Sequence, residues 1–191
     1  MKGWMLAVAL LVGFVIAPSD ADAMECFGVE YPGTIQVEGQ TLVLNGMGLR
    51  PGPLGVKVYM AGAYVPKKAR SSKDLLDLST PKRIVLTFMR DVSKKQVEKA
   101  YRQNLERAPD DIRPQITEDY ENIIAKLQAA DKGQTHVFTY LPKVGLKIET
   151  IGKHRVTITN PAMIEYFLGL YVGPNPRFQK MRDGIVTGKC Q

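Results

Sequence analysis

The sequence predicts an α+β domain in which helices pack on one face of a large antiparallel sheet. Three observations support this prediction. Short strands with alternating apolar residues fill the first half of the chain, two helical segments follow, and further strands and helices complete it. The chain has 191 residues, 45% of them apolar, which is enough to bury the core of one domain.

Four strands are expected in the first half of the chain. They cover residues 34–37, 41–44, 54–65 and 83–89. Glu38-Gly39 and Asn45-Gly46 are typical turn residues, and Pro51-Gly52-Pro53 separates the second strand from the third. A short helix is expected over residues 74–78, before the fourth strand.

Two longer helices are expected next. Ser93 followed by Gln96 matches a capping box, so one helix is expected from Lys94 to Arg107. Its apolar residues recur at helical spacing, and this spacing places Asn104 on the buried face. A second helix with one apolar face is expected over residues 114–130.

The last third of the chain returns to strands. They are expected over residues 135–141, 145–151 and 155–159. Residues 151–154 are typical of a tight hairpin. Asn160 before a proline is a typical helix start, so a helix is expected over residues 162–170. Asn175-Pro176 predicts a last short helix near residues 178–181.

The N-terminus has the features of a secretory signal peptide. A positive start at Lys2 precedes an almost unbroken apolar run over residues 4–17, and Ala21-Asp22-Ala23 matches the small-x-small cleavage pattern. A membrane anchor is the alternative, but this run is shorter than the roughly 20 residues that cross a bilayer. We therefore expect cleavage after Ala23, a mature domain over residues 24–191, and a periplasmic or secreted protein.

The charge of the exported chain constrains its partners. Residues 1–23 contain one Lys and two Asp, so their removal leaves 25 basic and 17 acidic residues and a net charge of +8. Nucleic acid is not an expected partner outside the cytoplasm. The charge favours carboxylate ligands, an acidic partner or an anionic membrane surface. Lys67, Lys68 and Arg70 form the densest basic cluster, which we interpret as a solvated face.

The two cysteines of the mature chain lie at its ends. In an oxidising compartment, Cys26 and Cys190 are expected to form a disulfide that joins the termini; two free thiols or an intermolecular bridge are the alternatives. His136 is expected to pack within a strand, and His154 to be exposed at a hairpin. The sequence contains no phosphate loop, metal-binding box or nucleophile elbow, so it predicts neither a metal site nor a cofactor.

Two neighbouring motifs identify a family. Residues 45–50 contain Gly-x-Gly-x-Arg, and residues 55–65 contain Gly-Ala-Tyr-Val in a long strand. With residues 86–93, 140–145 and 167–176, this pattern resembles the chalcone isomerase-like family over roughly residues 41–188. The resemblance implies an open-faced β-sandwich, in which a large antiparallel sheet and a layer of helices enclose an elongated pocket.

The resemblance also implies which residues form the site. In plant enzymes of this family, which close a chalcone into a flavanone, an Arg steadies the developing enolate while Thr, Tyr, Asn and a second hydroxyl residue position water and substrate. Arg50 and Asn104 match this Arg and this Asn. The strand Thr corresponds to Tyr59, the helix Tyr to Val97, and the late hydroxyl residue lies near Tyr166. Because three of the five positions differ, chalcone cyclisation is not expected.

Non-catalytic relatives of this fold bind fatty acids through the equivalent Arg. Together with the leader, the resemblance therefore implies an exported binding protein for a small amphipathic carboxylate, such as a fatty acid or haem, with Arg50 as the anchor in an apolar pocket. Polar contacts are expected from four further residues. They are Tyr59, Tyr101, Asn104 and Tyr166. For haem, His136 or a Tyr would be the axial ligand.

Three alternatives remain open from the sequence. Arg50 could simply be satisfied by backbone carbonyls or by a carboxylate such as Glu98 or Glu121, with the tyrosines serving as ordinary core residues. The protein could be an isomerase or lyase that uses Arg50 and Asn104 on an enone-like substrate. It could also be an accessory protein that acts through a protein partner.

Overall fold

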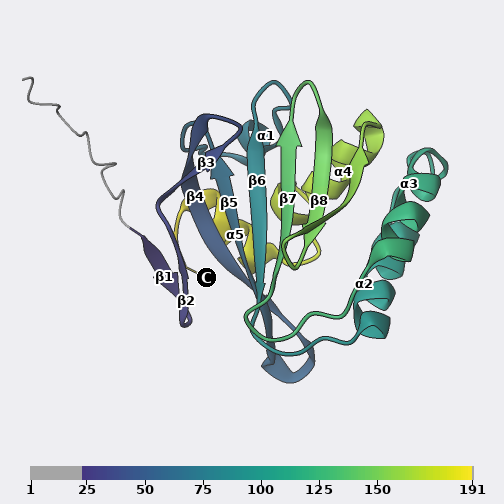
Figure 1. The fold of residues 1–191 in the computed structure, drawn as a ribbon, viewed down its shortest axis with the longest axis horizontal. Helices are drawn as coiled ribbons and strands as arrows, with labels where there is room; N and C mark the ends of the chain where they lie inside the picture. Colours follow the sequence, from purple (N-terminus) through teal and green to yellow (C-terminus); the bar gives the residue numbers. More distant parts are fainter. Residues whose placement is uncertain (1–22, 191) are drawn as a thin grey trace, which may run out of the picture.

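The computed structural model describes residues 23–190, so the expected signal peptide lies outside the described residues except for Ala23. A seven-stranded antiparallel sheet forms the centre of the molecule, and each strand pairs with the next one in sequence (Figure 1). The strands are β3 (Thr34–Val37), β4 (Gln40–Pro51), β5 (Lys57–Val65), β6 (Lys82–Phe88), β7 (Thr135–Leu141), β8 (Gly145–Thr150) and β9 (Lys153–Ile158).

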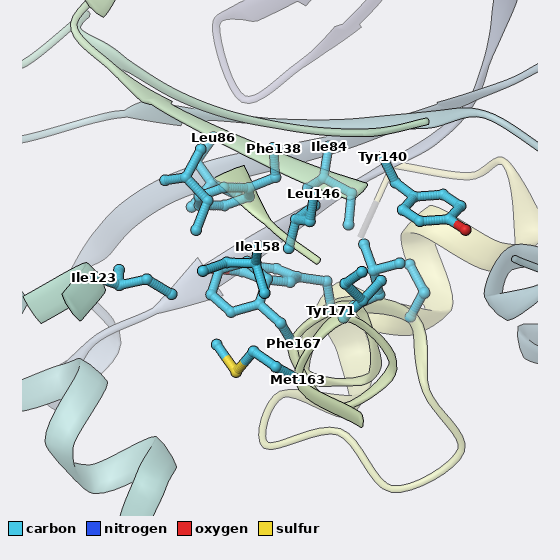
Figure 2. Close-up of a cluster of buried hydrophobic side chains, with 14 of the residues drawn as sticks. Ile84, Leu86, Ile123, Phe138, Tyr140, Leu146, Ile158, Met163, Phe167 and Tyr171 are labelled. Atoms are coloured by element: carbon cyan, nitrogen blue, oxygen red, sulfur yellow. The ribbon is translucent and has the colours of Figure 1, made fainter. Parts of the chain in front are cut away.

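Five helices pack with one face of this sheet. They are α1 (Ser72–Leu76), α2 (Lys94–Glu106), α3 (Arg113–Lys126), α4 (Pro161–Val172) and α5 (Gln179–Thr187). Figure 1 shows α4 and α5 against the sheet and α2 and α3 along one side of it. All five contribute to a core in which Phe138 of β7 meets Phe167 and Tyr171 of α4 (Figure 2). This arrangement confirms the predicted α+β fold.

A short hairpin that the sequence did not predict covers part of the opposite face. It consists of β1 (Met24–Cys26) and β2 (Val29–Tyr31). The Tyr31 hydroxyl donates to the carbonyl of Met60 at 3.0 Å and lies 2.8 Å from Oγ1 of Thr87. The Tyr31 ring lies directly on Gly62. A Cβ at this position would clash with the ring, so the absence of a side chain at Gly62 allows the hairpin to pack on the sheet.

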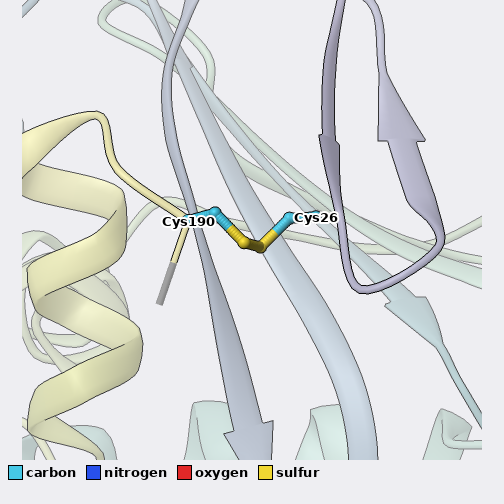
Figure 3. The surroundings of a disulfide bond; sticks show 2 residues. All are labelled: Cys26 and Cys190. Atoms are coloured by element: carbon cyan, nitrogen blue, oxygen red, sulfur yellow. A yellow bond between two sulfur atoms is a disulfide. The ribbon is translucent and has the colours of Figure 1, made fainter.

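The disulfide predicted from the two terminal cysteines is present. Cys26 of β1 is bonded to Cys190, 164 residues further along the chain (Figure 3). The bond links the β1–β2 hairpin to the segment that follows α5. Within residues 23–190, no helix is both long and apolar enough to span a membrane.

The turn predicted at Asn45-Gly46 is wrong, because both residues lie inside the long strand β4. The Asn45 side chain is buried. It donates to the carbonyl of Ile185 at 2.7 Å and accepts from the amide of Ala69, also at 2.7 Å. A residue that usually forms turns therefore serves as a buried bridge from the sheet to α5 and to the segment before α1.

Other boundaries also differ from the prediction, including that of α1, which spans Ser72–Leu76 rather than residues 74–78. Strand β5 begins only at Lys57, because Leu54 adopts a left-handed conformation with φ 56° in a short 3₁₀ turn. Helix α3 ends at Lys126, because Ala130 instead exchanges backbone hydrogen bonds with Val92 at 2.8 and 2.9 Å. Helix α5 is longer than expected. For β5 a left-handed turn residue, and for α3 a non-local backbone pairing, overrides the local signal.

Candidate ligand-binding site

Arg50 lies at the end of β4, on the side of the sheet that faces the helices. Its cross-strand partner is Tyr59 of β5. The guanidinium carbon lies 5.7 Å from the centre of the Tyr59 ring and 5.0 Å from the centre of the Phe178 ring. The side chain is half-buried, so a permanent positive charge sits between two aromatic rings.

Arg50 has no acidic partner within 4.0 Å in the described part of the chain. The two carboxylates considered from the sequence are engaged elsewhere: Glu98 lies 3.7 Å from Lys94, and Glu121 lies 2.8 Å from Arg102. The prediction that either one neutralises Arg50 is therefore wrong. Withdrawing a guanidinium from water without an anion is unfavourable, and contact with aromatic faces offsets only part of that cost.

Close packing of α5 on β4 brings Phe178 to Arg50. Gly48 lies in β4 two residues before Arg50, and a Cβ at this position would clash with the backbone carbonyl of Met181 in α5. Phe178 immediately precedes α5, so the position of this helix determines the position of the Phe178 ring. The Gly-x-Gly part of the family motif is thus a strand surface on which a helix can lie.

A second guanidinium contacts the same ring. The Arg177 guanidinium carbon lies 5.3 Å from the centre of the Phe178 ring, and Nη2 donates to Oε1 of Gln103 at 3.1 Å. Partial burial, together with the nearby Arg107 and Arg50, lowers the pKa of Arg177. Arg50 of β4 and Arg107, which follows α2, therefore both lie within electrostatic reach of Arg177.

A cleft of about 790 Å³ is lined by two of these arginines, Arg107 and Arg177. Its walls are the end of α2, one side of α4, the segment between α2 and α3, and the segment between α4 and α5. Apolar and small residues supply much of the lining. They are Leu76, Pro109, Ile112, Ala162, Gly169, Leu170, Gly173, Pro174 and Pro176. The volume falls in the range of roughly 300–1,000 Å³ typical of small-molecule sites.

A group of tyrosines lies beside the cleft. The Tyr166 hydroxyl donates to the backbone carbonyl of Asn104 at 2.5 Å, and both residues line the cleft. Tyr120 lies between Tyr166 and Tyr101, with 6.1 Å between ring centres on each side. The hydroxyls of Tyr101 and Tyr120 are buried without a hydrogen-bond partner in the described chain, and burial raises the pKa of both.

Comparison with protein families gives a match over almost all of the described chain. The family model described as chalcone isomerase-like matches residues 23–187. The chain belongs to the chalcone isomerase-like family. A solved structure with a similar fold is a fatty-acid binding protein of Arabidopsis thaliana, which is 17% identical with a TM-score of 0.67. That alignment covers 87% of this chain and 96% of the plant protein. A search of curated proteins gave no match.

The five residues predicted to bind a ligand are not all in one place in this chalcone isomerase-like domain. Asn104 and Tyr166 line the cleft. Arg50 and Tyr59 lie together near Phe178, and burial raises the pKa of Tyr59 to about 12 although Arg50 opposes that shift. Tyr101 is buried. This burial raises the pKa of Tyr101, and the nearby Tyr59 raises it further. The lining of the cleft therefore includes two of the five predicted residues.

The sequence reading missed Arg107, Arg177 and Phe178. Each has a weak local signal: Arg107 follows the last residue of α2, and Arg177-Phe178 follows the proline-containing segment 173–176 that carries part of the family resemblance. Neither signal shows that the two arginines belong to one site. Only the packing of α4 and α5 brings their segments together.

The two histidines lie in strands and do not line the cleft. His136 is buried, with its ring 4.8 Å from that of Phe88, and burial assisted by Arg155 lowers the pKa of His136 to about 4. His154 is exposed in β9 beside Thr157. Within residues 23–190, no group of three or more His, Cys, Asp or Glu side chains could hold a metal ion.

A second cleft of about 710 Å³ lies between α1, the segment after β5 and one side of α4. Lys67 and Lys73 line it together with Asp74 and Asp77, so both basic and acidic side chains are present there. All three residues of the basic cluster noted in the sequence are exposed. They are Lys67, Lys68 and Arg70.

Proposed function

We propose that this chain is an exported binding protein for a small amphipathic carboxylate, with an unbranched fatty acid as the best candidate. The observation that carries the proposal is Arg50. Its guanidinium is half-buried against Tyr59 and Phe178 and lacks an acidic partner in the described chain. A carboxylate would supply the missing negative charge through a two-pronged, charge-assisted contact.

The cleft supplies a place for the tail of such a ligand. It lies next to Phe178, because Arg177 both lines the cleft and contacts that ring. Its apolar lining favours an alkyl chain, at about 0.8 kcal/mol per buried methylene. The plant protein of similar fold is described as a fatty-acid binding protein, which supports the same class of ligand.

Haem is the less favoured ligand. It would need an axial His or Tyr at the site. His136 is buried beneath Phe88 and does not line the cleft, and the Tyr166 hydroxyl already donates to Asn104. A linear acid makes no such demand, so its requirements are met by Arg50 and the apolar lining alone.

Export is the second part of the proposal. It rests on the leader-like residues 1–23, and the Cys26–Cys190 disulfide supports it because such bonds persist in oxidising compartments. Intact-mass measurement on protein recovered from outside the cytoplasm of an expressing bacterium should show a chain that begins at Met24. A chain that still carries residues 1–23 would contradict signal-peptide cleavage.

Calorimetric titration tests the role of Arg50. The full chain is expressed with its own leader in a bacterium, purified and delipidated, and titrated with dodecanoate and with methyl dodecanoate. The ester keeps the tail but lacks the charge. We expect dodecanoate to bind at least tenfold more tightly than the ester, since a hydrogen bond to a charged group contributes about 1.5–3 kcal/mol.

The Arg50→Gln variant should remove this difference by weakening dodecanoate alone. Arg102→Gln is the matched control, because Arg102 lies on α2, is exposed, and pairs with Glu121 away from the cleft. Equal binding of acid and ester by the unmodified protein would reject Arg50 as the anchor. Failure of both ligands to bind would reject the binding function and favour an enzyme or a protein-docking role.

A further inference from the structure

The site has more positive charge than one carboxylate can neutralise. Arg50 and Arg177 lie 5.0 and 5.3 Å from the centre of the same Phe178 ring, and Arg107 lines the cleft together with Arg177. Partial burial and, after it, the like charges of Arg107 and Arg50 lower the pKa of Arg177. Such an arrangement is costly unless an anion is present for part of the protein's working cycle.

Acidic side chains do not provide this anion. None of the ion pairs in the described chain includes Arg50, Arg107 or Arg177. Among the described residues, Glu165 is the carboxylate that lines the cleft. It also lines the second cleft beside α1, as do Leu76 and Pro174, so it lies toward the wall that the two clefts share.

The Arg177 side chain is oriented to receive a ligand. Its Nη2 donates to Gln103, and its planar group lies against Phe178. These two contacts hold the planar guanidinium in a defined orientation beside the cleft. A guanidinium oriented in this way favours anions with several oxygens in a fixed geometry, because it can donate two parallel hydrogen bonds.

We propose that the preferred ligand of this cleft is an amphiphile with a doubly charged head group, a phosphate monoester on an alkyl or acyl tail. The inference rests on the proposed function, because it assumes that the cleft takes an amphiphile. A phosphate monoester carries close to two negative charges at neutral pH and three strong acceptor oxygens. Its charge and its oxygens match the two guanidinium groups of Arg50 and Arg177 at the Phe178 ring, with Arg107 also lining the cleft, whereas a carboxylate has one charge and two oxygens.

Ligands with one tail and two head groups test this inference. The protein is expressed from the full chain with its own leader, purified and delipidated as above. It is titrated calorimetrically at pH 8 with dodecyl phosphate, dodecanoate and inorganic phosphate. We expect dodecyl phosphate to bind about tenfold more tightly than dodecanoate, the ratio for one additional charge-assisted contact. Inorganic phosphate should bind at least a hundredfold more weakly than dodecyl phosphate, because it has no tail to bury.

Variants separate the head-group contacts. Arg177→Gln and Arg107→Gln should each weaken dodecyl phosphate about tenfold and dodecanoate less than threefold, while Arg102→Gln should change neither. Arg177→Lys keeps the charge without the planar fork, so it should fall between the unmodified protein and Arg177→Gln. Thermal unfolding of each variant establishes that a loss of binding is not a loss of fold.

The outcomes distinguish this inference from the proposed function. The preference for a dianionic head group would be overturned if dodecanoate bound as tightly as dodecyl phosphate, or if Arg177→Gln weakened the binding of both equally. Either result would leave the carboxylate-binding function in place. Inorganic phosphate binding as tightly as dodecyl phosphate would overturn the amphiphile in favour of a free-phosphate site. Failure of every ligand to bind would overturn both proposals.

Discussion

The buried imidazole of His136 predicts a specific loss of stability in acid. Burial lowers the pKa of His136 to about 4, against 6.5 in an exposed histidine. Between these values the unfolded chain binds a proton that the folded protein excludes. Stability is therefore fully present above pH 6.5 and falls as the pH drops toward 4, by up to about 1.4 kcal/mol per pH unit and about 3 kcal/mol in total.

The His136→Leu variant removes this titration while keeping an apolar side chain against Phe88. Urea unfolding at a series of pH values from 7.5 to 4, with the disulfide intact, gives the free energy of unfolding for each protein. The difference in stability between His136→Leu and the unmodified protein should shift by about 3 kcal/mol in favour of the variant over this range. His154→Leu, which removes an exposed imidazole from β9, serves as the control.

Two results would refute this reasoning. One is a stability difference between His136→Leu and the unmodified protein that stays constant from pH 7.5 to 4. The other is an NMR titration in which the His136 ring protonates near pH 6.5 in the folded protein, because the imidazole would then be hydrated rather than buried.

Two further changes test how the chain is held together. Cys26→Ser with Cys190→Ser opens a loop of 164 residues and should lower the free energy of unfolding by up to about 5 kcal/mol; an unchanged urea midpoint would contradict this. Gly48→Ala should lower stability by about 1–3 kcal/mol and weaken dodecanoate binding, because its methyl group pushes α5 and Phe178 away from β4. Gly169→Ala in α4 is the control, because its methyl group has open space, and it should raise stability by up to about 1 kcal/mol. Equal effects of the two substitutions would show that the loss of stability in Gly48→Ala does not come from packing against α5.

Local signals in the sequence were reliable where the structure depends on near neighbours. The capping box predicted from Ser93 and Gln96 is present, with both reciprocal hydrogen bonds at the start of α2. The hairpin between β8 and β9 has φ values of 53° at Ile151 and 68° at Gly152, as a two-residue turn requires. Both features are set by residues within four positions of each other.

Signals failed where a distant segment supplied a better partner. Asn45-Gly46 has turn residues, yet Asn45 binds Ile185 and Ala69 from inside a strand, and the glycine accommodates α5. The β1–β2 hairpin was missed because its strands have three residues each and are held by Tyr31 and the disulfide rather than by a long alternating pattern.

The sequence by itself determined the α+β class, most elements, the family resemblance, the disulfide and Arg50 as a candidate anchor. Periodicity, capping residues, short motifs and the number of cysteines can all be read from the sequence without knowing which distant segments meet. The tertiary structure alone decided that Arg177 and Arg50 contact the same ring, Phe178, and that Glu98 and Glu121 pair elsewhere. The contacts at Phe178 depend on how closely α5 lies on β4, and that distance arises from packing between segments far apart in the chain.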